Sequence, residues 1–142
     1  VSAFLELLAA SGATLLLISG TDRAAVQEEA AMLDLARFFT GGIYGSLNDV
    51  ARYSKQKVIE ELLAREGIGG EQLAVFGDGP VEIRCAAAAG GIGVGVTCEE
   101  TGRTGRDPAK YRRVRNAGAD IIITDFRNKA CLAAYLAASS NA

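Results

Sequence analysis

The stretch LAVFGDGPVE, residues 73–82, is the part of the sequence that decides the fold class. Its first four residues form a continuous apolar run, which is typical of a strand in a sheet covered on both faces. Pro80 suits the first position of a helix, so we expect a strand, a tight turn at Gly77-Asp78-Gly79 and then a helix. A strand that leads directly into a helix is the repeating unit of parallel α/β structure.

Four further apolar runs have the same character, and amphipathic helical patterns separate them. They are TLLLIS at 14–19, IYG at 43–45, IGVGV at 92–96 and IIIT at 121–124. Strand and helix therefore alternate along the whole length, which favours right-handed crossovers between parallel strands. The sequence predicts a single α/β domain, residues 1–142, built on a doubly wound, mostly parallel sheet of about five strands.

The composition argues against several classes of function. The 142 residues are 49% apolar, enough for a core, and a formal charge of −2 provides no basic field to attract nucleic acid. No apolar run approaches the roughly 18 residues that a membrane span needs. The absence of histidine excludes a Ser-His-Asp triad, a Cys-His pair and a histidine metal site within these residues. Three cysteines without a CxxC pair favour the reducing cytoplasm.

Polar residues directly after the apolar runs are the candidate functional residues, because ligands of open parallel sheets bind outside the carboxyl ends of the strands. Asp78 and Glu82 are the strongest pair. Two carboxylates at a strand end suit Mg²⁺, which binds one or two protein carboxylates and completes its shell with water and phosphate. A plain turn followed by a glutamate at the helix start is the alternative. The constrained Gly-Asp-Gly-Pro sequence favours the metal site.

Two weaker candidates lie earlier in the chain. Ser19 can offer its hydroxyl to an anion, and Gly20 lets the backbone approach closely. Taken alone, these residues are better explained by a simple turn and helix cap. Lys55 and Lys57 begin a helix, where their charge opposes the macrodipole, and a solvated helix face is the default interpretation.

Two other patterns have less weight. The glycines of GGIGVG, residues 90–95, superficially resemble a dinucleotide fingerprint, but they lie before and inside a strand, whereas the fingerprint needs them after one. We interpret them as a helix end followed by close packing. A basic cluster further on is interpreted as a solvated helix face, because it carries a single aromatic residue on a chain of net negative charge. The cluster comprises Arg103, Arg106, Lys110, Arg112, Arg113 and Arg115.

Taken in order, the candidate sites resemble the motifs of the haloacid dehalogenase-like (HAD) phosphatase superfamily. Ser19 resembles its second motif, Lys55 or Lys57 its third, and GDGPVE, with Asp78 and Glu82, its fourth. The resemblance covers nearly the entire chain and implies a HAD-like Rossmannoid core. Glu82 stands where aspartate is more usual, and its extra methylene could change it from a direct metal ligand to a group that supports the ligands.

The resemblance implies a Mg²⁺-dependent phosphate monoester hydrolase that acts on a small phosphorylated metabolite through an aspartyl-phosphate. Asp78 would hold Mg²⁺, and Glu82 would support it or orient Lys55. Ser19 and the backbone at Gly20 would bind the phosphoryl oxygens, and Lys55 would neutralise charge. Phosphoryl transfer asks mainly for such positioning and electrostatic stabilisation. The alternatives are a catalytically silent α/β module that binds an anion or a partner, and a nucleotide-binding oxidoreductase favoured by the glycines at 91–95.

The first motif of the family, Asp-x-Asp at the end of a central strand, has no counterpart here, because residues 1–18 contain no aspartate. That motif supplies the nucleophile and the general acid/base. In the family its strand lies between the strand that ends at Ser19 and the strand that precedes Asp78. We therefore expect these residues to be the C-terminal part of a longer protein, completed by an upstream segment, and to be inactive on their own.

Overall fold

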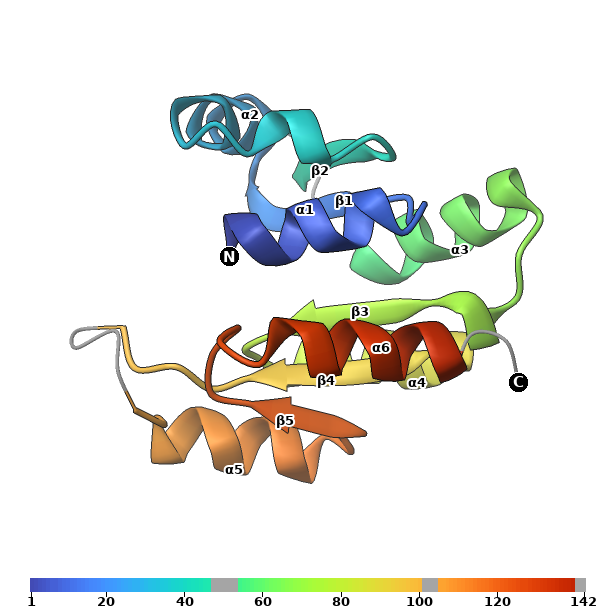
Figure 1. Ribbon diagram of the computed structural model, residues 1–142. Helices are drawn as coiled ribbons and strands as arrows, with labels where there is room; N and C mark the ends of the chain where they lie inside the picture. The colour runs from blue at the N-terminus through green and yellow to red at the C-terminus, as the bar shows by residue number, and fades with distance from the viewer. Residues whose placement is uncertain (47–53, 101–104, 140–142) are drawn as a thin grey trace. The chain divides into compact units, whose positions relative to one another are not determined.

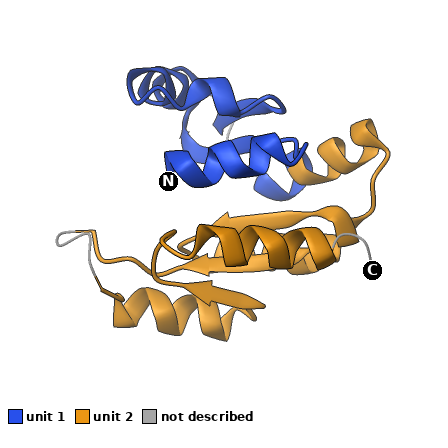
Figure 2. Cartoon of the chain, in the orientation of Figure 1, with its two compact units in different colours: residues 1–58 blue, residues 59–142 orange. Residues whose placement is uncertain are grey.

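The computed structural model describes residues 1–46, 54–100 and 105–139, and strands alternate with helices along them (Figure 1). The chain divides into two compact units, residues 1–58 and residues 59–142 (Figure 2). The boundary falls inside α3 (Lys55–Glu66). That residues 1–142 form one domain stays a prediction.

Unit 1 contains two parallel strands and the helices around them. In chain order its elements are α1 (Ser2–Ala10), β1 (Leu16–Asp22), α2 (Arg23–Met32), the 3₁₀ turn η1 (Ala36–Phe38) and β2 (Gly42–Ser46). β1 pairs in parallel with β2, and α2 packs against both strands. The buried apolar side chains of this unit are Phe4, Val26, Ala30 and Phe38.

The carboxyl end of β1 is irregular. The register runs evenly up to the pair Ile18 and Tyr44 and resumes at Asp22 and Ser46, so residues 19–21 of β1 lie opposite Gly45 alone. Such a bulge bends the strand and is common beside functional sites. A Cβ atom on Gly45 would lie 2.7 Å from the carbonyl oxygen of Thr21 and 2.5 Å from the Cα of Arg23. The bulge therefore needs glycine at position 45.

Unit 2 contains a three-stranded parallel sheet in the order β3-β4-β5. After the rest of α3 come the 3₁₀ turn η2 (Gly70–Gln72), β3 (Ala74–Gly77), α4 (Pro80–Ala89), β4 (Ile92–Val96), α5 (Pro108–Asn116), β5 (Ile121–Ile123) and α6 (Lys129–Ser139). α4 and α5 pack against the sheet and against each other, and α6 lies in front of the sheet in Figure 1. Fully buried side chains in this core include Ile83, Val94 and Val114.

The predicted fold class is confirmed, since all five predicted strands are present and every strand pairing within the sheets is parallel. The sheet count is different: among the described residues the strands form two sheets and not one. One sheet consists of β1 and β2, and the other of β3, β4 and β5. Within residues 1–46, 54–100 and 105–139, no helix is both long and apolar enough to cross a membrane.

The interpretation of the glycines at 90–95 is confirmed. Gly90 ends α4 in the left-handed conformation, with φ at 75°. A Cβ on Gly95 would lie 2.7 Å from Cγ2 of Val114, so this glycine lets α5 pack directly onto β4. Because the glycines lie before and inside β4, they do not form the turn after a strand that a dinucleotide site requires.

The contact at Gly45 gives a test of the β1 bulge. Gly45→Ala should lower the free energy of unfolding by about 1–3 kcal/mol, because the added methyl meets backbone atoms that cannot move away cheaply. Gly20→Ala is the matched control, since a Cβ at Gly20 meets no atom within 4 Å. Urea denaturation of both variants measures the difference. Equal stability of the two variants would contradict the packing described for Gly45.

Candidate active site

The turn after β3 carries two carboxylates. β3 ends at Gly77, Asp78 lies in the turn with its side chain 60% exposed, and α4 begins at Pro80, as the sequence predicts. Glu82, in the first turn of α4, packs its stem over Gly77, where a Cβ would lie 2.3 Å from that of Glu82. Its Oε2 lies 3.1 Å from the Cβ position of Gly79. Glycine on both sides of Asp78 therefore makes room for the Glu82 side chain beside the turn.

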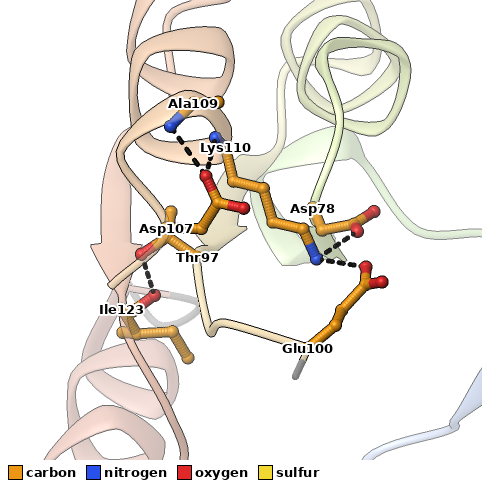
Figure 3. A network of polar contacts seen from close by, with 7 residues as sticks. All are labelled: Asp78, Thr97, Glu100, Asp107, Ala109, Lys110 and Ile123. Atoms are coloured by element: carbon orange, nitrogen blue, oxygen red, sulfur yellow. Dashed lines mark hydrogen bonds and ion pairs between the residues drawn. The ribbon is translucent and has the colours of Figure 1, made fainter. Parts of the chain in front are cut away.

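A buried lysine from α5 pairs with Asp78. The Lys110 side chain is only 8% exposed, and its Nζ lies 3.0 Å from Oδ2 of Asp78 and 2.8 Å from Oε1 of Glu100 (Figure 3). These carboxylates, Glu100 first and Asp78 second, raise the pKa of Lys110 above its ordinary value, although burial opposes the shift. A buried charge costs free energy unless it is paired and hydrogen-bonded, and here two carboxylates provide the pairing.

The start of α5 is fixed by a set of hydrogen bonds that places Lys110. Asp107 is the N-cap: its Oδ1 accepts hydrogen bonds from the backbone N–H groups of Ala109 at 2.7 Å and Lys110 at 3.0 Å (Figure 3). The Asp107 N–H donates to the Thr97 carbonyl at 2.7 Å, and the Thr97 hydroxyl donates to the Ile123 carbonyl at 3.1 Å. The carboxyl ends of β4 and β5 are thereby joined to the first turn of α5.

Lys110 and Glu100 are the members of this network that the sequence interpretation missed. The prediction of a solvated face is wrong for Lys110, which is buried. It holds for the other described members of the cluster, all of which are exposed: Arg106, Arg112, Arg113 and Arg115. Arg103 lies outside the described residues. A usable signal was the spacing of Lys110 and Val114, because residues four apart share one helix face and Val114 is a core residue.

Ser19 and Lys55 lie in unit 1. Oγ of Ser19 accepts a hydrogen bond from the Thr21 N–H at 3.1 Å, and Asp22 caps α2, so the turn-and-cap interpretation is confirmed for this segment. Lys55 is half-buried at the first position of α3, whereas Lys57 is exposed. Anion binding by Ser19 and Gly20, and the meeting of Ser19 and Lys55 with Asp78 and Glu82, stay predictions.

The carboxyl end of β5 has an acidic residue of its own. Asp125 Oδ2 accepts a hydrogen bond from Nε of Arg127 at 2.7 Å, and Oδ1 accepts one from the Arg127 N–H at 2.9 Å. The Arg127 guanidinium holds the pKa of Asp125 below its usual value. This carboxylate is therefore engaged within its own loop.

The donor set at the β3 turn fits Mg²⁺. Within the described residues, no group of three or more histidine, cysteine, aspartate and glutamate side chains could hold a metal ion. Mg²⁺ does not require such a cage, because it commonly uses one or two carboxylates and fills its octahedron with water and substrate oxygens. Asp78 and Glu82 supply two carboxylates from one turn, and the exposure of Asp78 leaves room for the remaining ligands.

A comparison with family models matches residues 1–90 to the haloacid dehalogenase-like hydrolases. The chain belongs to this family. The matched region includes all three site segments of the sequence prediction, at Ser19, Lys55 and Asp78. The family assignment therefore confirms the resemblance that the order of the motifs indicated. No curated protein matches the chain in sequence.

Solved structures of the family have the same fold. A haloacid dehalogenase-like family hydrolase from Streptococcus pneumoniae matches with 25% identity and a TM-score of 0.69 over 94% of this chain and 57% of its own. A protein described as a predicted phosphatase from Clostridium acetobutylicum matches with 21% identity and a TM-score of 0.74 over 96% and 58%. A HAD family hydrolase from Deinococcus radiodurans, with bound phosphate and sodium, matches with 22% identity and a TM-score of 0.72 over 97% and 58%. The chain thus spans little more than half the length of these structures.

The Asp107 cap gives a pH-dependent prediction. Hydrogen bonds from the backbone N–H groups of Lys110 and Ala109 lower the pKa of Asp107 from its ordinary 3.8. Since the folded-state pKa is the lower one, the charge of Asp107 stabilises the protein above pH 3.8, and this contribution disappears as the pH falls through the folded-state pKa. Asp107→Asn should therefore be less stable than the wild type at pH 7, and the difference should close in acid.

Urea midpoints of the two proteins at a series of pH values between 7 and 2.5 measure this difference. A difference that stays constant with pH would show that the charge of Asp107 contributes nothing, and that only its hydrogen-bonding geometry matters.

Proposed function

We propose that this protein is a Mg²⁺-dependent phosphate monoester hydrolase that acts on a small phosphorylated metabolite. The observation that carries the proposal is the pair of carboxylates, Asp78 and Glu82, at the carboxyl end of β3 in a chain of the HAD-like hydrolase family. Bound phosphate in the structurally similar Deinococcus radiodurans hydrolase supports a phosphorylated substrate. Three cysteines without a CxxC pair support a cytoplasmic location.

The nucleophile is an aspartate that lies outside these 142 residues. No aspartate precedes Ser19 in the sequence, and among the described strands the sheet is divided between the β1–β2 pair and β3. A strand that carries Asp-x-Asp and completes a continuous sheet accounts for both observations. With this strand in place, residues 1–142 form a single core domain. Without it the chain lacks the nucleophile and is inactive on its own.

Each site residue has a defined task in this mechanism. Asp78 holds the cation, and Glu82, whose stem packs over Gly77, supports Asp78 or orients Lys55. Ser19 and the backbone after it donate hydrogen bonds to the phosphoryl oxygens, and Lys55 neutralises negative charge on the aspartate and the phosphoryl group. When bound, Mg²⁺ supplies charge neutralisation for the transferred phosphoryl group.

Substitution of Asp78 tests the assignment. In the complete protein, Asp78→Asn should reduce magnesium-dependent hydrolysis of para-nitrophenyl phosphate more than about 100-fold, because loss of a group that merely supports a metal ligand already costs 10–100-fold. Arg112→Ala is the control, since Arg112 is an exposed residue on α5. Mg²⁺ affinity, measured by calorimetry, should fall in the first variant and stay unchanged in the second.

Two outcomes would reject parts of the proposal. Equal effects of the two substitutions would contradict the assignment of Asp78. Binding of phosphate without turnover by the complete protein would favour the alternative of a silent anion-binding module.

A further inference from the structure

The two side chains of the Lys110–Asp78 ion pair differ in how much of each is exposed to solvent. The lysine side chain is 8% exposed and the Asp78 side chain 60%, so the fixed partner is the lysine. Its helix is anchored at the N-cap by Asp107 and at the sheet by Val114, which is fully buried against Gly95. An exposed aspartate in a glycine-rich turn otherwise has several rotamers available. The ammonium restricts Asp78 to the rotamers that keep Oδ2 against it.

The ion pair also affects how Asp78 can bind a cation. Nζ of Lys110 lies against Oδ2, so a cation that preserves this ion pair takes Oδ1 alone. Mg²⁺ needs near-ideal octahedral geometry and suits a single carboxylate oxygen, whereas Ca²⁺ readily accepts both oxygens of one carboxylate. A carboxylate with one oxygen already engaged therefore fits Mg²⁺ better than Ca²⁺.

Glu100 reduces the repulsion between the lysine and the cation. A lone ammonium beside Asp78 would cancel its charge and weaken cation binding. Here the ammonium also pairs with Glu100 at 2.8 Å, so the three groups together retain one negative charge, the same as an isolated aspartate. Glu100 lies in the segment after β4. The backbone next to it is held by an antiparallel β-bridge between Cys98 and Arg106 and by a hydrogen bond from the Glu99 N–H to the Gly105 carbonyl at 3.3 Å.

We propose that Lys110 is a positioning residue that holds Asp78 for coordination through one oxygen and thereby favours Mg²⁺ over Ca²⁺. This inference rests on the proposed function, in which Asp78 is a metal ligand. Glu100 keeps the ammonium neutralised, so the cation and the lysine can share Asp78. Figure 3 shows the arrangement, with the Lys110 ammonium between the two carboxylates.

The experiment measures Mg²⁺ and Ca²⁺ binding to the complete protein by calorimetry. Lys110→Met keeps the length of the stem and removes the ammonium. It should weaken Mg²⁺ binding about 10-fold, the lower end of the effect of losing a partner of a metal ligand, and should shift the preference from Mg²⁺ toward Ca²⁺. Glu100→Gln should weaken both cations by less than about fivefold and leave their ratio unchanged, because Glu100 is 77% exposed and its charge is screened.

A second readout does not depend on metal. In the metal-free protein, the backbone amide resonances of Gly77, Asp78 and Gly79 should shift in Lys110→Met and stay in place in Arg112→Ala, the control on the exposed face of the same helix. Lys110→Gln, which puts a neutral polar group in the same space, is the second variant and decides the outcome if the methionine variant does not fold. It should change the cation preference in the same direction.

The outcomes separate this inference from the proposed function. An unchanged ratio of Mg²⁺ to Ca²⁺ affinity in the Lys110 variants, with binding lost in Asp78→Asn, would overturn the role of Lys110 and leave Asp78 as a ligand. Mg²⁺ binding that tightens in the Lys110 variants would also overturn it, because the lysine would then compete with the cation. Absence of binding in the wild type, or unchanged binding in Asp78→Asn, would overturn both.

Discussion

Parallel pairing of β3, β4 and β5 is the constraint on which the candidate site depends. Parallel strands end at the same edge of a sheet, so the residues that follow them are brought together even though they are far apart in the sequence. Asp78 follows β3, and the loop with Glu100 follows β4. Thr97 and Asp107 then join this edge to α5. The acidic turn and the buried lysine meet because the sheet is parallel.

The same packing explains why glycine is so frequent along this part of the chain. Gly95 admits Val114 against β4, and Gly77 admits the stem of Glu82. Close approach of α5 allows Lys110 to reach across to the β3 turn, and close approach of Glu82 keeps a second carboxylate beside Asp78. Packing and chemistry therefore depend on the same positions, and a substitution at Gly77 or Gly95 would affect both.

The strands, the helix start at Pro80 and the place of Asp78 could be predicted from the sequence, because short apolar runs, N1 proline and glycine turns act over a few residues. Composition does not distinguish Lys110, because six basic residues within a short segment have the composition of a solvated face. Its spacing to Val114 separates it from the exposed Arg112 only once Val114 is known to be a core residue. Glu100 was missed for the same reason, since its partner lies on another element. The division into two sheets reflects strand pairing, which local pattern does not determine.

Paramagnetic broadening by Mn²⁺, which prefers the same oxygen ligands as Mg²⁺, tests the central claim most directly. If Asp78 holds the cation of the proposed phosphate site that includes Ser19 and Gly20, Mn²⁺ added to the complete protein should broaden the amide resonances of residues 77–79 and of residues 19–21. The same addition to Asp78→Asn should broaden neither. Broadening at residues 77–79 that persists in Asp78→Asn, or broadening centred on residues remote from both segments, would contradict the account.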